Sequence, residues 1–283
     1  MPTFNKKSSH TADGLVYIRI LTNIPLAKEI FNIFQKLQGV SLEEMKQAAS
    51  RTYIYPFMEA RYLMTSRELE KSGVNQIFEL ASGFSPRGIK MTKSPTVTYV
   101  ELDLPDKLKT KVAIVDELIK RGNIKTRNDL YFEGGNVIST TDFERGSNHF
   151  KNEPVGVICE GLLRYISKED IKKLARNIFN LLKHNGGVWI TPDIEFFDPK
   201  KLTPEEKKYY DDRVQKLGYD VRLNLFKDEN EAETFFNECG FHVIKIPLTN
   251  IINELVIPSK IGISKEEALK SLVNRFVFSM TVN

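Results

Sequence analysis

Three predicted strand ends carry side chains whose types could bind a nucleotide-like cofactor. One strand runs into the turn Ala81–Gly83, another ends at Asp103, and a third ends at Glu160. Glycine and small neighbours let the backbone approach a ligand closely. An acid at the end of the second strand can accept hydrogen bonds from both ribose hydroxyls, and twenty residues separate Gly83 from Asp103. This spacing favours a cofactor site.

Two of these signals also have a structural explanation. A strand–glycine–helix turn occurs in many α/β proteins, and Asp103, just before Leu104 and Pro105, also fits the N-terminal acid of a helix. Glu160 differs, because it ends an apolar run in which an unpaired carboxylate would be costly. A functional role is therefore favoured for Glu160.

Three blocks of sequence carry a resemblance to a known family. They are FELASGFSPRG, TYVELDLP and PVGVICEGLLRYIS, in this order along the chain. They are similar to the patterns VELGAGxDTR, YxEVDLP and xxxAEGLLxYL of the leucine carboxyl methyltransferase family, which includes bacterial members tied to polyketide O-methylation. The E-G-L-L-x-Y block is the most specific of the three. The resemblance implies a class I methyltransferase that uses S-adenosylmethionine.

The resemblance also implies roles for individual residues. Asp103 matches the acid that binds the ribose, and Glu160 matches the acid that faces the charged methionine part of the cofactor. Arg61, in MEARY, resembles the arginine that reaches the cofactor carboxylate. Asn136 and Val137 stand at about the place of an Asp-Leu pair that contacts adenine, where an Asn oxygen can still accept from the amino group.

The turn after the first strand departs from the family pattern. Gly83 matches the second family glycine, but Ala81 stands in place of the first, and Ser85-Pro86 replaces Asp-Thr. Alanine is small enough for close approach of the ligand if its φ is negative. We therefore expect Ala81 and Gly83 to complete the cofactor-binding set.

The acceptor implied by the family is a carboxylate of a small molecule or of a peptide C-terminus. It is ionised at neutral pH, so we expect no general base and no catalytic side chain. Arg164, four residues after Glu160, could hold the acceptor by paired hydrogen bonds, although a surface arginine covering apolar residues is the alternative. Tyr165 is a second candidate on the acceptor side, with packing against the core as its alternative.

Other functions stay open at this point. The acceptor could be a hydroxyl of a polyketide-like molecule, or the chain could bind S-adenosylmethionine without catalysis. A nicotinamide-dependent oxidoreductase is disfavoured, because ASGFSPRG lacks a full GxGxxG. No two of the four histidines have metal-ligand spacing, so no metal site is expected.

Two further residues have structural expectations. Arg87 follows the turn, and we expect it to form a structural salt bridge to Asp103 or Glu101. Trp189 is interior to a predicted strand and is expected in the core.

Hydrophobic periodicity predicts the elements that position these residues. Helices are expected at 15–21, 24–37, 41–50 and 57–72, the third with a capping box of Ser41 and Glu44. Because they precede the first strand, they predict a helical N-terminal cap over residues 1–73.

From residue 74 strands and helices alternate. Strands are expected at 74–80, 96–103, 128–135, 156–160, 186–194, 241–248 and 274–283. Helices are expected at 105–121, 168–184 and 228–240, with another in an insertion at about 198–226. This pattern predicts an α/β fold: a doubly wound, mostly parallel seven-stranded sheet over residues 74–283. The order of the last elements is typical of class I methyltransferases, in which the final strand is antiparallel.

The composition is that of an ordinary globular protein. The chain has 283 residues, 41% hydrophobic, and a net charge of +4 that is spread along the chain, so no nucleic-acid partner is expected. The polar N-terminus and the lack of a long apolar run predict no signal peptide and no membrane partner. With two cysteines that form no CxxC pair, the expected location is cytoplasmic. The sequence does not indicate the oligomeric state.

Overall fold

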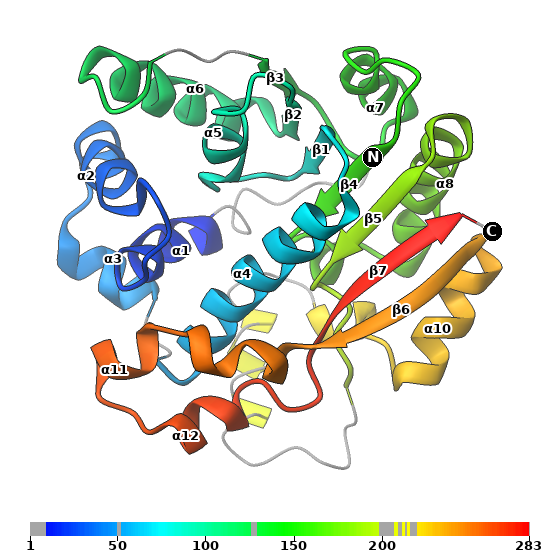
Figure 1. Cartoon of the computed structure of the whole chain (residues 1–283). Coiled ribbons are helices and arrows are strands. Elements are labelled where there is room, and N and C mark those ends of the chain that lie inside the picture. The colour runs from blue at the N-terminus through cyan, green and yellow to red at the C-terminus, as the bar shows by residue number, and fades with distance from the viewer. Residues whose placement is uncertain are drawn as a thin grey trace.

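The computed structural model describes residues 10–49, 52–125, 129–197, 207–208, 211–212, 214–215 and 220–282. These residues form one mixed sheet with helices on both faces. Within them seven strands have the order β3-β2-β1-β4-β5-β7-β6 (Figure 1). The strands are β1 (Gln76–Leu80), β2 (Thr98–Asp103), β3 (Leu130–Gly134), β4 (Val155–Cys159), β5 (Gly187–Thr191), β6 (Phe241–Pro247) and β7 (Phe276–Val282). β1 to β5 are parallel, and β7 is antiparallel between β5 and β6. The predicted doubly wound sheet is confirmed.

The central strands are buried on both faces. Every residue of β1 and β4 is buried, as expected for parallel strands covered by helices on either side. Alternation along each strand places Ile77 and Ile158 in one core and Phe78 and Val157 in the other. Glu79 lies in this pattern on the face of Ile77, so a charge enters the apolar layer there.

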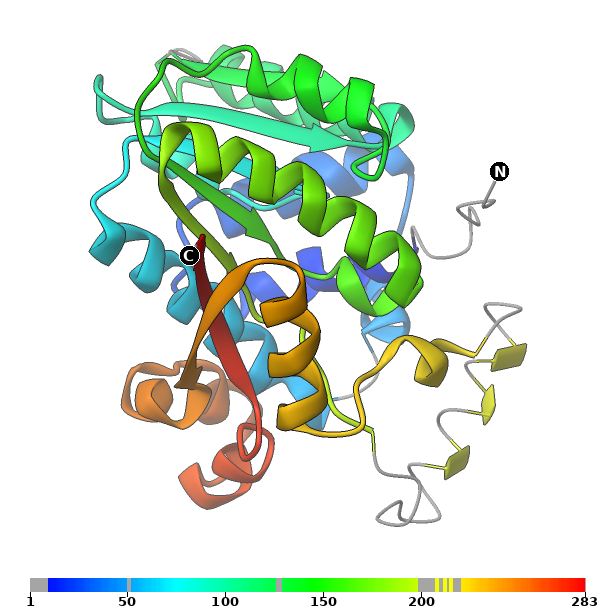
Figure 2. The ribbon, with the colours of Figure 1, turned by 90° about the vertical axis from the view of Figure 1, so that its right-hand side faces the viewer.

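Three helices pack on the face of the sheet that carries Phe78. They are α7 (Thr140–Ser147), α8 (Lys168–Asn185) and α10 (Glu229–Glu238), seen in Figure 2. Trp189 on β5 is fully buried in this layer. Its ring centroid lies 5.5 Å from that of Phe236 and 5.4 Å from that of Phe241. Its Nε1 donates to Cys159 Sγ at 3.4 Å, which confirms it as a core residue.

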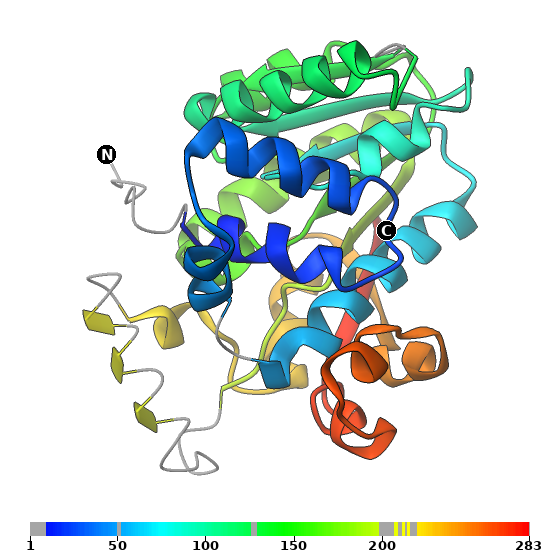
Figure 3. The same cartoon turned by 90° about the vertical axis from the view of Figure 1, so that its left-hand side faces the viewer.

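The opposite face carries the predicted N-terminal helices and two more (Figure 3). These helices are α1 (His10–Ile20), α2 (Ala27–Gln38), α3 (Leu42–Ala48), α4 (Tyr55–Ser72), α5 (Arg87–Met91) and α6 (Pro105–Lys120). α4 contacts β4, β5 and β7 directly, whereas α2 packs on α6, and α1 packs on α2 and α3. The capping box of Ser41 and Glu44 is present. The four predicted helices are therefore confirmed, and the division at residue 73 stays a prediction.

Several short elements were not predicted from the sequence. They are α5, α7, α11 (Ile257–Ile261), α12 (Lys265–Lys270) and the 3₁₀ segments at 52–54, 163–165, 221–224 and 248–254. Elements of one or two turns carry too few apolar positions to show a period. The helix expected in the insertion at 198–226 falls largely outside the described residues.

Two kinds of feature are absent from the part of the chain that the structure describes. None of its helices combines the length and the apolar composition needed to cross a membrane. No group of three His, Cys, Asp or Glu side chains in it could hold a metal ion.

Both cysteines, Cys159 and Cys239, are free thiols.

Candidate functional site

The candidate site lies at the carboxyl edge of the parallel strands. The strand order reverses between β1 and β4, and ligands of open α/β sheets bind at such a switch point. The turn after β1 and the residues Asp103, Asn136 and Glu160 all follow or end strands at this edge. The structure thus brings the predicted cofactor residues to one edge of the sheet.

The turn after β1 has an unusual backbone. Ala81 has a φ of +54° and Gly83 a φ of +53°. The negative φ on which close approach of a ligand at Ala81 depended in the sequence analysis is therefore not present. The Ala81 N–H donates to Leu102 O at 2.7 Å, and this bond from the adjacent strand holds the turn in place. A left-handed conformation costs a residue with a Cβ about 1–2 kcal/mol, which the surrounding structure must offset.

Asp103 ties this turn to the end of β2. Its Oδ2 accepts from the Gly83 N–H at 2.7 Å, and its Oδ1 accepts from the Leu104 N–H at 2.7 Å, just before α6. Burial raises the pKa of Asp103, although these two backbone hydrogen bonds and the charges of Lys111 and Lys107 lower it. Apart from Gly83 and its two chain neighbours, no described residue has an atom within 4 Å of the point where a Gly83 Cβ would stand, so space for a ligand remains beside the turn.

Glu160 and Arg61 meet at the switch point. Arg61 Nε donates to Glu160 Oε1 at 3.1 Å, and the Glu160 side chain is only 7% exposed. Burial opposes ionisation of Glu160, but the charges of Arg87, Arg61 and Arg19 outweigh it and lower its pKa. Glu160 is therefore held as a carboxylate, and the two terminal nitrogens of Arg61 donate no hydrogen bond to any described residue.

Arg87 forms the structural ion pair expected of it, but with other partners. It donates through Nη1 to Glu79 and through Nη2 to Glu160 Oε2 at 2.7 Å, not to Asp103 or Glu101. The predicted partners were therefore wrong. Period-two alternation places Glu79 and Glu101 side by side on one face of the sheet, and a separate cation, Lys111, pairs with Glu101.

Arg19 is a site residue that the sequence reasoning missed. It lies on α1, with its Cζ 5.8 Å from the centre of the Tyr62 ring. Its guanidinium makes no hydrogen bond or ion pair with a residue that the structure describes. Burial lowers its pKa, although Glu160 raises it. A cation inside the apolar run LVYIRIL was the available signal.

Asp193 was also missed. It follows β5, and its carboxylate accepts from the backbone N–H groups of Gly161, Leu162 and Leu163 at 2.6, 2.6 and 3.1 Å. Burial raises its pKa, against the charge of Arg61 and these backbone bonds. Asp193 therefore fixes the loop directly after Glu160. An acid just past a strand end was the signal, as at Asp103.

Asn136 and Val137 lie in the loop after β3. The Asn136 N–H donates to Asp142 Oδ2 at 2.8 Å, and its side-chain oxygen accepts from the Ile138 N–H at 3.1 Å. Val137 is buried in the core that includes Phe78. This loop is therefore held in a defined shape next to the end of β2, and the Asn136 oxygen keeps a second lone pair.

Arg164 is not a solvated surface arginine. Its Nη1 pairs with Glu195 Oε1 at 3.0 Å, and its side chain is 12% exposed. The Cζ of Arg164 lies 5.8 Å from the ring centre of Tyr165, which is partly buried. Both residues belong to the 3₁₀ segment after Glu160, and Glu195 belongs to the segment after β5.

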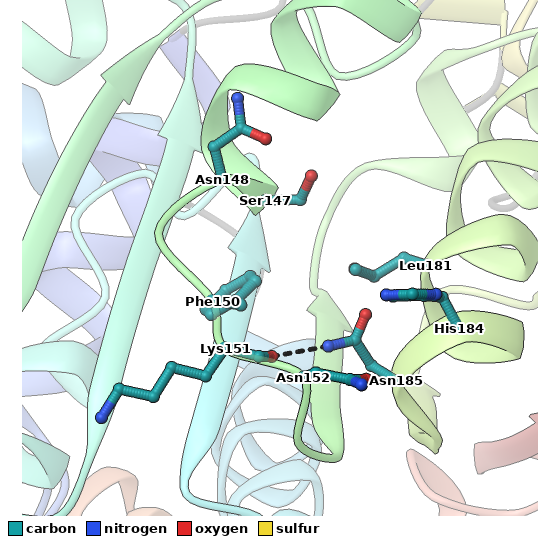
Figure 4. A pocket seen from close by; sticks show the side chains of 8 residues that line it. All are labelled: Ser147, Asn148, Phe150, Lys151, Asn152, Leu181, His184 and Asn185. Carbon is teal, nitrogen blue, oxygen red and sulfur yellow. Dashed lines mark hydrogen bonds between the residues drawn. The ribbon is translucent and has the colours of Figure 1, made fainter.

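A polar pocket of about 310 Å³ lies at the other end of the strands (Figure 4). It is lined by residues at the ends of α7 and α8 and just before β4, among them Ser147, Lys151 and His184. None of the predicted site residues lines it. This pocket is therefore separate from the candidate site.

The fold and the site together define a class of protein. A doubly wound sheet with an antiparallel last strand, and acids at the ends of β2 and β4, is the class I methyltransferase arrangement. The family model described as "leucine carboxyl methyltransferase" matches residues 31–179. The chain belongs to this family, and the matched region includes Arg61, Glu160 and Arg164.

Solved structures with a similar fold are methyltransferases of low sequence identity. The S-adenosylmethionine-dependent methyltransferase SibL in its apo form is 14% identical, with a TM-score of 0.50, over 96% of this chain and 69% of SibL. An O-methyltransferase family protein from Burkholderia thailandensis is 13% identical, with a TM-score of 0.48, over 88% of this chain and 62% of its own.

A third such structure is Haemonchus contortus phosphoethanolamine N-methyltransferase 2 in complex with S-adenosyl-L-methionine. It is 14% identical, with a TM-score of 0.48, over 78% of this chain and 52% of its own. The chain thus spans between about half and two thirds of the length of the first solved structures it matches. No curated protein matches the chain.

Proposed function

We propose that this protein is an S-adenosylmethionine-dependent O-methyltransferase that methylates a carboxylate of a small molecule or of a peptide C-terminus. The observation that carries the proposal is the Arg61–Glu160 pair at the switch point of a leucine carboxyl methyltransferase fold. The residues that follow fit the cofactor in type, charge and hydrogen-bonding capacity.

The charges of the site suit the methionine end of the cofactor, which carries an ammonium and a carboxylate. Three arginines, Arg19, Arg61 and Arg87, face two acids, Glu79 and Glu160, while the third acid nearby, Asp193, accepts from three backbone N–H groups. Glu160 would bind the ammonium. Arg61, with its free terminal nitrogens, and Arg19 would bind the carboxylate by charge-assisted hydrogen bonds.

The nucleoside end fits the two loops beside β2. Asp103 would accept hydrogen bonds from the ribose hydroxyls while it keeps its hydrogen bond from the Gly83 N–H. The space beside Gly83 is open to the ligand. Asn136 would accept from the adenine amino group, and Val137 would support the ring. Ala81 would set the direction in which the turn leaves β1.

When bound, the cofactor supplies an electrophilic methyl group on a sulfonium. The protein must then align an acceptor that is already anionic, so no side chain has to remove a proton. Alignment of the two reactants can lower the activation barrier by roughly 7–11 kcal/mol. Arg164 would release Glu195 and form an ion pair with the acceptor carboxylate instead. Tyr165 would lie beside this acceptor.

The domain boundary and the location of the protein are part of the same proposal. Residues 1–73 would form the cap over a core of residues 74–283. The protein would work in the cytoplasm, where its two free thiols are stable.

The product tests the acceptor. Incubation with cofactor tritiated on the methyl group and with small-molecule and peptide carboxylates should give a methyl ester. The ester should release labelled methanol under mild base. A labelled product that survives this treatment would contradict the carboxylate and indicate an ether or an amine. Binding of the cofactor without any transfer would indicate a non-catalytic binder.

A further inference from the structure

Arg87 connects Glu160 to two other elements of the protein, β1 and α4. Its side chain is 1% exposed. Nη2 donates to Glu160, Nη1 donates to Glu79, and Nε donates to Ser66 Oγ on α4 at 3.0 Å. Its Cζ lies 4.4 Å from the ring centre of Tyr62. All three nitrogens of the guanidinium therefore donate to the protein itself, and the group lies against an aromatic ring.

Glu79 is in turn fixed from β2. Its second oxygen accepts from the Tyr99 hydroxyl at 2.8 Å. Arg87 is thus anchored to β1, and through β1 to β2, before it reaches Glu160. A guanidinium bound in this way has no freedom to follow a ligand.

Arg61 is held far more loosely. It donates to Glu160 through Nε alone, and its ring contact is the Phe57 ring, 5.6 Å from Cζ. The two oxygens of Glu160 therefore have unequal partners. One is bound by the anchored Arg87, and the other by Arg61, whose two terminal nitrogens donate to no described residue.

We infer that Arg87 is a positioning residue of the cofactor site: it holds the Glu160 carboxylate in place and ionised, so that Glu160 binds the ammonium group while Arg61 turns to the carboxylate of the same ligand. The inference rests on the proposed function. Arg87 itself does not touch the cofactor.

The protonation of Glu160 depends on the groups around it. Glu160 interacts electrostatically with Arg19 on α1, Arg61 and Tyr62 on α4, Arg87 on α5 and Cys159 on β4. Glu79 on β1 shares Arg87 with it, and Asp193 after β5 acts on the same Arg61. Burial raises the pKa of Glu160, and Arg87 is the first of the cations that bring it below its ordinary value. Without Arg87 that pKa rises, so Glu160 gains a proton as the pH falls and loses its attraction for an ammonium group.

The test is the double variant Arg87→Met/Glu79→Gln. Removal of Arg87 alone would leave the Glu79 carboxylate buried without its cation, which is strongly destabilising, and the chain could fail to fold. The amide oxygen of the substituted glutamine can still accept from the Tyr99 hydroxyl. The matched control is Arg67→Met/Glu254→Gln, which removes an exposed arginine–glutamate pair whose arginine is on α4 and, like the test variant, leaves the net charge unchanged.

Calorimetric titration with S-adenosylhomocysteine between pH 6 and pH 8.5 separates the outcomes. We expect the wild type and the control to bind with little dependence on pH. The double variant should weaken on acidification, by up to about tenfold per pH unit below the raised pKa. A double variant that binds like the wild type, or that is equally weakened at every pH, would overturn the inference and leave the proposed function standing. A folded wild type that does not bind would overturn both.

Discussion

At the scale of single residues, the site is a set of charged side chains that are largely removed from water. A buried ion pair often contributes little net stability, because removing two charges from water offsets their attraction. Glu160 nevertheless faces three arginines, Arg19, Arg61 and Arg87, and Arg19 makes no hydrogen bond or ion pair with a described residue. A zwitterionic ligand explains this arrangement, since it brings both an ammonium and a carboxylate.

Asp103 gives a prediction at this scale. We expect Asp103→Ala to weaken binding of S-adenosylhomocysteine by about 1.5–3 kcal/mol, the range of a hydrogen bond to a charged group. The variant loses the ribose acceptor and also the bond that holds Gly83. Calorimetry measures the loss.

Asp106→Asn is the control for Asp103. Asp106 is exposed in the first turn of α6, three residues further on, and should leave affinity unchanged. Unchanged affinity in Asp103→Ala would mean that β2 does not end at the ribose.

At the scale of elements, the turn after β1 carries the most backbone strain of the site. Ala81 and Gly83 both have positive φ, and the sequence departs from the family glycine at the first of them. The cross-strand bond to Leu102 O and the Asp103 bond to Gly83 hold the turn on either side. The Cβ of Ala81 is therefore tolerated at an energetic cost.

Ala81→Gly should raise the free energy of unfolding by up to about 1 kcal/mol. Glycine removes the left-handed strain of about 1–2 kcal/mol, and the greater entropy of the unfolded chain cancels part of this gain. Denaturant unfolding measures the change. Ala113→Gly, inside α6, is the control and should lower stability by about 1 kcal/mol. A loss of stability in Ala81→Gly would show that the turn is not strained at this residue.

At the scale of the whole molecule, the order of strands and long helices could be predicted from the sequence. Apolar runs and alternation predict the strands β1, β2, β4 and β5, and apolar residues at three- and four-residue spacing predict the helices α2, α4, α6 and α8. Each of these elements is long enough to show its pattern. Short elements such as α5 and α12 could not be predicted in this way. The φ of Ala81 depends on bonds from a neighbouring strand, so no local pattern indicates it.

The site was predictable only in part for a similar reason. Gly83, Asp103 and Glu160 carry signals because each stands at a strand end. The contact between Arg61 and Glu160 joins positions 99 residues apart, and the residue-based reasoning alone could not have paired them. The network of Arg87 depends on which face each strand residue takes once the sheet is assembled.

One measurement tests the central claim most directly, that this edge of the sheet binds S-adenosylmethionine. It is calorimetric titration of the wild type and of Glu160→Gln with S-adenosylhomocysteine and, separately, with NAD. We predict that the wild type binds S-adenosylhomocysteine and not NAD, and that Glu160→Gln weakens this binding by about 1.5–3 kcal/mol. Binding of NAD, with no response to S-adenosylhomocysteine, would contradict the account.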